Sequence, residues 1–281
     1  MGIKWLLFSA ILADLLSELC GYSFLPMYAK KPLTAENAEN IRGDRRGWFS
    51  GGFVDLHSLH SRARNSVWLA LVEFAVVAGL FWADVHHHIY VSKTPYLFLL
   101  GWASLRLRGM KWKDVGFARP RSWRNALLLG VAVGLCMEAL ELFVTQPLLA
   151  RWLGKMPDLS DFGDMKGNLK LFLIYLVLVW TLGVLGEEVD YRGYLMNRVA
   201  GVFRETKAAW VVSLIVVSVV FGCGHLDQGA TGMIENVWNG LLLGALYLAC
   251  DRNLAVPVIA HAVGDTLDFV LIYLGRYPGM H

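Results

Sequence analysis

Three short segments place ionisable side chains within or at the ends of strongly apolar stretches. They run from Glu187 to Arg192, from Phe221 to His225, and from His261 to Asp265. A charged or imidazole side chain in a membrane segment costs a few kcal/mol on insertion scales, so each segment is a candidate functional site. A glutamate can take a proton from water, while imidazoles can hold the water, bind a metal or stabilise an oxyanion. Together the three segments predict the activation of a water molecule for hydrolysis.

Helical spacing distinguishes the two adjacent glutamates. Residues four apart share a helix face, whereas adjacent residues diverge by about 100°. Glu188 is therefore predicted to pair with Arg192, which leaves Glu187 as the free carboxylate. His261 and Asp265 have the same spacing, so the acidic side chain can orient the imidazole.

Residue spacing alone leaves other interpretations open. The pair of Glu188 and Arg192 can be no more than an ion pair at a helix end, and membrane histidines can be hydrogen-bonded packing groups. A set of one Glu and two His also suits a proton relay in a transporter, although no pair of broken helices with repeated topology is evident. A third alternative is a catalytically silent membrane scaffold or immunity factor of the same fold.

The elements that must position these residues are long and apolar. The 281 residues are 56% hydrophobic and 17% charged, with a mean hydropathy of +0.46, which is far more apolar than a soluble domain. Long apolar runs without alternation favour membrane helices of roughly 17 to 25 residues over barrel strands. We therefore expect an all-α, polytopic protein of the cell membrane, with about seven or eight transmembrane helices in contact with the lipid bilayer. The predicted spans are 5–19, 67–82, 95–105, 126–143, 171–186, 208–224, 237–250 and 254–274.

The distribution of charge predicts the orientation. The formal net charge of +3 argues against a nucleic-acid partner. Between Arg106 and Arg124 the chain has seven basic residues against the single acidic Asp114. The positive-inside rule therefore predicts that this loop is cytoplasmic, and alternation then places residues 151–170 outside and 192–207 inside. The active site is expected toward the cytoplasmic side.

The three segments, taken in order, resemble the motifs of the CPBP family. This family comprises CAAX proteases and bacteriocin-processing enzymes and is also called the ABI or type II CAAX-prenyl endopeptidase family. Its pattern is EExxxR, then FxxxH, then HxxxN or HxxxD, on successive membrane helices, and the segments that begin at Glu187, Phe221 and His261 match it. The resemblance predicts a protease core over residues 125–275, with N-terminal membrane helices and cytoplasmic loops over residues 1–124.

The resemblance implies an intramembrane endopeptidase, classed with metalloproteases, that cuts membrane-associated peptides or proteins, including prenylated or leader peptides. It implies that Glu187 activates the water with the help of His225, and that Glu188 and Arg192 support the site. His261 and the residue four positions later would stabilise the oxyanion or complete the site.

Two features of the resemblance leave the chemistry open. Asp265 stands where the prenyl-endopeptidase branch typically has Asn, and an ionised Asp cannot donate a hydrogen bond to an oxyanion. Asp265 is therefore expected to be protonated, to bind a metal or to orient His261. Zinc is a candidate cofactor, because Glu187, His225 and His261 could supply its three protein ligands, but only if Glu187 no longer acts as the base.

Overall fold

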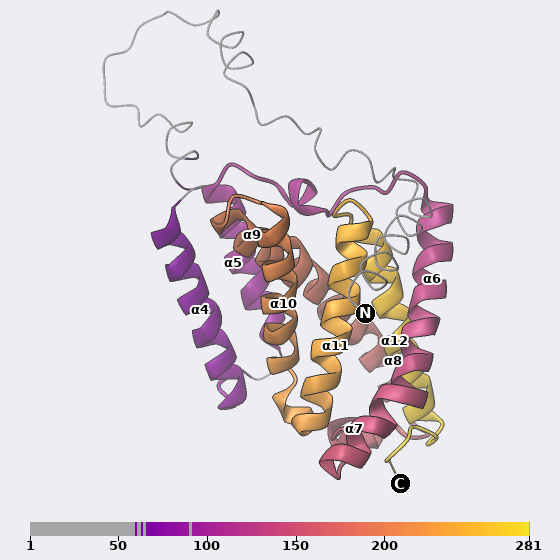
Figure 1. Ribbon diagram of the computed structural model, residues 1–281. Coiled ribbons are helices and arrows are strands. Elements are labelled where there is room, and N and C mark those ends of the chain that lie inside the picture. The colour runs from indigo at the N-terminus through magenta and orange to yellow at the C-terminus, as the bar shows by residue number, and fades with distance from the viewer. Residues whose placement is uncertain (1–59, 61–62, 64–65, 90–91, 281) are drawn as a thin grey trace, which may run out of the picture.

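The computed structural model describes residues 60, 63, 66–89 and 92–280. These residues form a helical bundle without a single strand among them (Figure 1), so the predicted all-α fold is confirmed. The predicted span 5–19 lies outside the described residues. The elements are α4 (Val67–Val85), α5 (Thr94–Leu107), η1 (Trp112–Val115), α6 (Trp123–Leu140), η2 (Glu141–Thr145), α7 (Gln146–Leu153), η3 (Ser160–Met165), α8 (Leu169–Leu178), η4 (Val179–Gly186), η5 (Glu188–Met196), α9 (Asn197–Val202), α10 (Lys207–Cys223), η6 (Leu226–Gln228), α11 (Gly229–Ala249) and α12 (Ala255–Tyr273).

Side-chain caps fix where four of these helices begin. Ser66, Ser122, Asn168 and Thr206 precede α4, α6, α8 and α10, and each accepts a hydrogen bond from the backbone N–H three residues later. Such a cap satisfies one of the backbone donors that the first turn of a helix leaves without a partner. The starts of these helices therefore follow from the local sequence.

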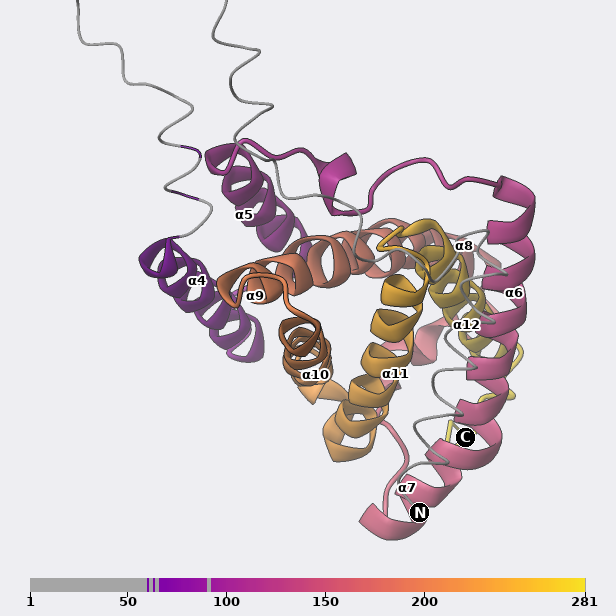
Figure 2. The same ribbon diagram turned by 45° about the horizontal axis from the view of Figure 1, so that its top comes forward.

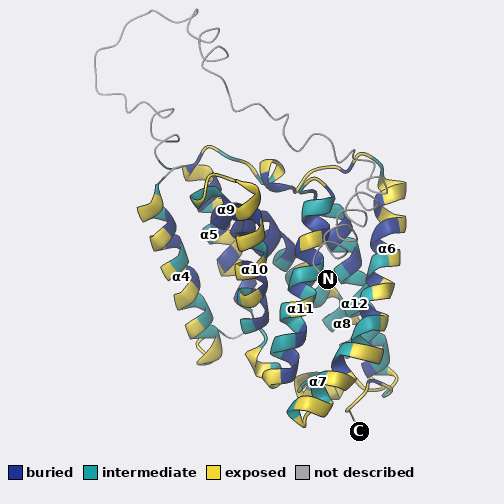
Figure 3. Ribbon diagram, viewed as in Figure 1, coloured by how far each residue is buried: buried dark blue, intermediate teal, exposed yellow. Residues whose placement is uncertain are grey.

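Four helical stretches of the described residues are long and apolar enough to cross a membrane, and the pair α10 and α11 adds a fifth if it counts as one bent span. The predicted seven or eight helices are therefore not confirmed. One reason is that α5 has only 14 residues, fewer than the roughly 17 that a span requires. Another is that the predicted spans 208–224 and 237–250 lie in helices that meet at an angle of 61°. Large apolar side chains such as Trp68 and Phe143 are exposed, as expected for contact with lipid. Exposed residues recur along the outer helices, such as α4 (Figure 3).

One continuous helical stretch of 34 residues, Leu169–Val202, carries the first motif. It comprises α8, η4, η5 and α9, and it runs from the side of α12 to a position between α4 and α10 (Figures 1 and 2). The prediction ended this span at residue 186, but the backbone continues through the charged motif as a π-helix. π-helical segments are rare, and they frequently lie at functional sites.

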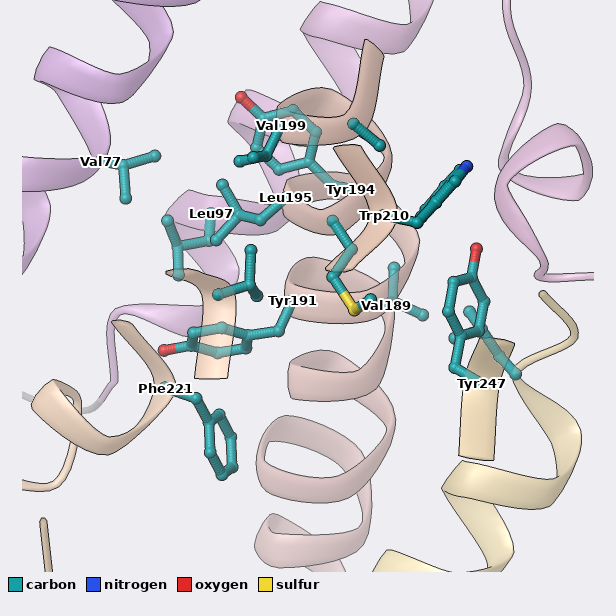
Figure 4. Packing of buried hydrophobic residues seen from close by; sticks show 14 residues of the cluster. Val77, Leu97, Val189, Tyr191, Tyr194, Leu195, Val199, Trp210, Phe221 and Tyr247 are labelled. Atoms are coloured by element: carbon teal, nitrogen blue, oxygen red, sulfur yellow. The ribbon is translucent and has the colours of Figure 1, made fainter. Parts of the chain in front are cut away.

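The main core surrounds η5, all of whose residues are buried. Aromatic side chains fill it, among them Tyr191, Tyr194 and Phe221, and Figure 4 shows Tyr191 directly above Phe221 of α10. The N-terminal helices contribute to the same core, because Glu73 of α4 forms a buried ion pair with Arg198 of α9. The charged motif from Glu188 onward is thus buried in the core of the bundle.

Close packing of α6 on α12 positions the third motif. A Cβ atom on Gly134 would lie 2.6 Å from the carbonyl oxygen of Ala260, and one on Gly130 would lie 2.6 Å from Cβ of Ile259. Small residues allow helix backbones to approach in this way in membranes. The approach fixes the turn of α12 that carries His261.

Candidate active site

Glu188 forms the centre of a buried network. Its Oε1 atom lies 2.8 Å from Nη1 of Arg192, and both side chains are almost completely buried. The pairing predicted from helical spacing is therefore present. The same Oε1 atom also lies 2.9 Å from Nδ1 of His261, which belongs to α12. That contact was not predicted, because it joins residues 73 positions apart.

Phe221 lies between the two histidines of the motifs. Its ring centroid is 4.9 Å from that of His225 and 6.2 Å from that of His261. The guanidinium of Arg192 covers the same ring, with Cζ 4.6 Å from the centroid, a favourable cation–π arrangement. The phenylalanine of the second motif therefore links the ion pair of the first motif to the imidazole of the third.

Four of the predicted site residues line one cavity of about 370 Å³: Glu187, His225, His261 and Asp265. The carboxylate of Glu187 makes no hydrogen bond or ion pair with another described residue, in agreement with its prediction as the free carboxylate. Glu188 and Arg192 do not line the cavity and lie behind it. The structure thus separates the two adjacent glutamates as the helical spacing suggested.

The histidine nitrogens are held by different partners. Nδ1 of His225 lies 2.9 Å from the carbonyl oxygen of Phe221. Because a carbonyl oxygen can only accept, this nitrogen carries a proton, and Nε2 of a neutral His225 is an acceptor. In α12, Nε2 of His261 lies 3.5 Å from Oδ1 of Asp265, so the predicted proximity of these two residues is present.

The described residues contain no group of three His, Cys, Asp or Glu side chains arranged to hold a metal ion. Glu187, His225 and His261 share the cavity, and Nδ1 of each histidine is engaged with a protein oxygen, which leaves Nε2 as the nitrogen that could bind a metal. The three side chains are nevertheless not arranged as a group that could hold a metal ion in this geometry. The zinc site therefore stays a prediction.

Sequence reasoning missed a second set of carboxyl groups on the same cavity. We call it the inner acidic group, and it consists of Glu138, Glu141, Glu235 and Asp268. Three of these residues belong to α6, η2 and α12, within stretches apolar enough to span a membrane, and Glu235 lies in α11. Ionisable residues within predicted spans were the signal used for the motifs, and the same signal marks Glu138, Glu141 and Asp268.

Acidic side chains also surround the rim of the cavity. These rim acids are Asp158, Asp161 and Asp227. The side chain and the backbone N–H of Ser160 hydrogen-bond to Asp158 and lower the pKa of its carboxyl group. The rim is therefore negatively charged at neutral pH.

The rim lies at the end of the bundle that contains α7 and η6, opposite the end that contains η1 and α9 (Figure 1). Residues 151–170 lie at the end of the bundle that contains the rim. The distribution of charge along the sequence predicted that this segment lies outside the cell. The basic segment between Arg106 and Arg124 includes η1 at the opposite end. A cytoplasmic active site and an external segment 151–170 are therefore incompatible predictions in this fold.

Comparison with known proteins gives a family match over part of the chain. Residues 169–267 match the family model described as type II CAAX prenyl endopeptidase Rce1-like. A protein of Verminephrobacter eiseniae described as UPF0761 membrane protein is 32% identical over 96 residues, which are 34% of this chain. That match covers 21% of the relative's own length, and its description names no activity. No solved structure matches.

The family match contains all three motifs, because it begins with α8 before Glu187 and ends after Asp265 in α12. It also lies within the predicted core of residues 125–275, although it does not test the boundary at residue 125. Over residues 169–267 the chain is therefore similar to the type II CAAX prenyl endopeptidases, and the family resemblance indicated by the three motifs is confirmed.

Proposed function

We propose that this protein is an intramembrane endopeptidase that hydrolyses peptide bonds of membrane-associated substrates with a water activated by Glu187. One observation carries the proposal: a carboxylate without a partner among the described residues lines the same cavity as His225 and His261. The family match over residues 169–267 supports the same class of reaction. Prenylated and leader peptides are the substrates that the resemblance offers.

Hydrolysis begins with proton removal. As the water oxygen attacks the carbonyl carbon of the scissile bond, Glu187 takes the proton that the water loses. The acceptor Nε2 of a neutral His225 holds the second hydrogen of the water and so orients it. The carbon–nitrogen bond then breaks, the proton passes to the amine nitrogen, and a carboxylate and an amine leave.

His261 is placed to stabilise the negative charge that develops on the carbonyl oxygen of the scissile bond. Its Nδ1 atom donates toward Glu188, and a protonated Nε2 atom can donate either to Asp265 or to an oxyanion in the cavity. Asp265 would then orient the ring and stabilise its positive charge, without itself donating to the oxyanion. Glu188 and Arg192 would act as positioning residues, because they reach the cavity only through His261 and Phe221.

The orientation of the cavity forms part of the proposal. The seven basic residues between Arg106 and Arg124 favour a cytoplasmic location for that loop. Because the rim lies at the opposite end of the bundle, we propose that the cavity opens away from the cytoplasm. This choice replaces the expectation of a cytoplasmic active site.

Cleavage by a Glu187→Gln variant tests the function. Purified wild-type protein in detergent should cut members of a library of membrane-anchored peptides, and Glu187→Gln should reduce the rate by at least about 10²-fold, the lower range for a lost general base. Asp164→Asn makes the same chemical change at an exposed residue outside the cavity and is the matched control. Unchanged cleavage by Glu187→Gln would refute the mechanism. Rescue of a knockout phenotype by the same variant would instead indicate a membrane scaffold or immunity factor.

A further inference from the structure

The cavity holds a large excess of carboxyl groups. The described residues contribute nine of them: four in the inner acidic group, three rim acids, and those of Glu187 and Asp265. Among the described residues that line it, Lys93 is the single lysine or arginine, and its Nζ atom is engaged 2.8 Å from Oδ2 of Asp84 and 3.0 Å from the carbonyl oxygen of Gly224. The inner acidic group therefore lacks a compensating cation among these lining residues.

Two members of the inner acidic group have oxygens that are not satisfied. Glu138 is only 5% exposed, and its Oε1 atom is buried without a hydrogen-bond partner in the described part of the chain, as is Oδ1 of Asp268. The two carboxyl groups lie within hydrogen-bond reach of each other. An unpartnered polar atom in a protein interior carries a desolvation cost, so these oxygens indicate a site that is completed by a ligand.

The remaining two members are held in place by neutral donors. Oε2 of Glu141 accepts a hydrogen bond of 2.6 Å from Asn239. The two carboxyl oxygens of Glu235 accept hydrogen bonds of 3.5 Å, Oε1 from the hydroxyl group of Thr145 and Oε2 from the amide of Gln146. Amides and hydroxyls orient these carboxyl groups without supplying an opposite charge, so the site is fixed in shape and is open to a cation.

A long organic cation fits this site better than a metal ion does. The described carboxylates do not converge as metal ligands. An ammonium or guanidinium donates to several oxygens at once, and its aliphatic stem can pack on apolar walls such as Leu243 and Ile272 of the cavity. The site is also part of the same cavity as Glu187, so it can bind one residue of a peptide whose scissile bond lies at Glu187.

We propose that the inner acidic group binds a lysine or arginine side chain of the substrate near the bond that is cut, and so selects basic peptides. This inference rests on the proposed function. It also limits the choice of substrate, because a CAAX sequence ends in a free carboxylate, which brings no cation to the inner acidic group. A CAAX terminus would therefore have to lie elsewhere in the cavity.

A binding measurement separates this inference from the proposed function. We would titrate fluorescent, lipid-anchored peptides against the full chain in detergent. The peptides form sets, one set for each sequence position, and the members of a set differ only by having Lys, Arg, norleucine or Glu at that position. At one position Lys and Arg should bind roughly tenfold to a hundredfold more tightly than norleucine, in keeping with hydrogen bonds between charged groups. Glu138→Gln with Asp268→Asn should abolish this preference, whereas the exposed control Asp164→Asn should retain it.

Each outcome has a distinct meaning. Equal affinity of the wild-type protein for the Lys and norleucine peptides at every position would overturn the inference, and this comparison does not depend on any variant that could misfold. Loss of the preference in Asp164→Asn would also overturn it, because the effect would then be one of overall charge. A preference for Lys and Arg without any cleavage would support the binding site and refute the proposed hydrolysis. Cleavage without that preference would support the hydrolysis and refute the binding site.

Discussion

His261 of α12 places its Nδ1 atom 2.9 Å from Oε1 of Glu188, although the two residues are 73 positions apart in the chain. The same oxygen forms an ion pair with Arg192, whose Nη1 atom lies 2.8 Å away. Glu188 therefore joins the first motif to the third through Oε1. Its Oε2 atom is buried without a hydrogen-bond partner among the described residues, and the residue does not line the cavity. This relationship gives a physical reason for the division of labour between the adjacent glutamates, with Glu187 open to water and Glu188 committed to structure.

Removal of the Glu188 carboxylate should destabilise the protein strongly. Glu188→Ala leaves Arg192 uncompensated in a buried site and also removes the partner of His261. By analogy with broken buried ion pairs, the free energy of unfolding should fall by about 3 to 5 kcal/mol. The expected result is a much lower yield and a lower melting temperature in detergent.

Two variants serve as controls for this prediction. Glu188→Gln together with Arg192→Gln removes both charges and keeps hydrogen-bonding groups, so much of the yield should return. Glu187→Gln breaks no pair and should fold normally while being inactive. Misfolding of Glu187→Gln, combined with a stable and active Glu188→Ala, would mean that the roles of the two glutamates are reversed.

Asp265 should tolerate replacement by asparagine better than replacement by an apolar residue. The Oδ1 atom of Asn can still accept a hydrogen bond from Nε2 of His261, which lies 3.5 Å from Oδ1 of Asp265. We expect Asp265→Asn to lose less than about tenfold in cleavage rate and Asp265→Leu to lose about 10²-fold or more. Both variants should be checked for folding by their melting temperature. Equal activity of the Leu and Asn variants would exclude a role for this side chain in holding His261.

Local patterns and long-range contacts contributed differently to what the sequence could predict. The pairing of Glu188 with Arg192 follows from four-residue spacing, and the predicted helical spans follow from hydropathy. The contact between Glu188 and His261 could not be predicted, because it requires the packing of η5 against α12. The π-helical backbone through the first motif has no local signal in composition, and the span was therefore ended too early, at residue 186.

The inner acidic group illustrates a signal that was present and not used. Glu138, Glu141 and Asp268 interrupt apolar stretches in the same way as the motif residues do. Their meeting with Glu235 in one cavity depends on how α6, α11 and α12 pack together. Sequence could therefore identify three of the four residues as unusual, but only the fold places them beside Glu187.

The glycines of α6 should be intolerant of larger side chains. A Cβ atom on Gly134 would lie 2.6 Å from the carbonyl oxygen of Ala260 and 2.8 Å from Cβ of Val263, so Gly134→Val must push α6 away from α12. Overpacking of this kind costs about 1 to 3 kcal/mol, and displacement of α12 should also reduce cleavage through His261. Gly79→Val in α4 is the matched control, because a Cβ atom there has no neighbour within 4 Å. Similar melting temperatures for the two variants would contradict this packing argument.

The final prediction concerns the side of the membrane to which the cavity opens. Lys113 lies in η1 at the basic end of the bundle, while Asp164 lies in η3 at the end that contains the cavity rim. Both residues are exposed, so a cysteine at either position should react with a thiol reagent that can reach it. The positive-inside rule predicts that Asp164→Cys reacts with a membrane-impermeant reagent added to intact cells, and that Lys113→Cys reacts only after permeabilisation. The wild-type protein gives the background from its own cysteines. The reverse labelling pattern would show that the cavity opens to the cytoplasm, and would mean that the basic loop between Arg106 and Arg124 does not determine the orientation of this chain.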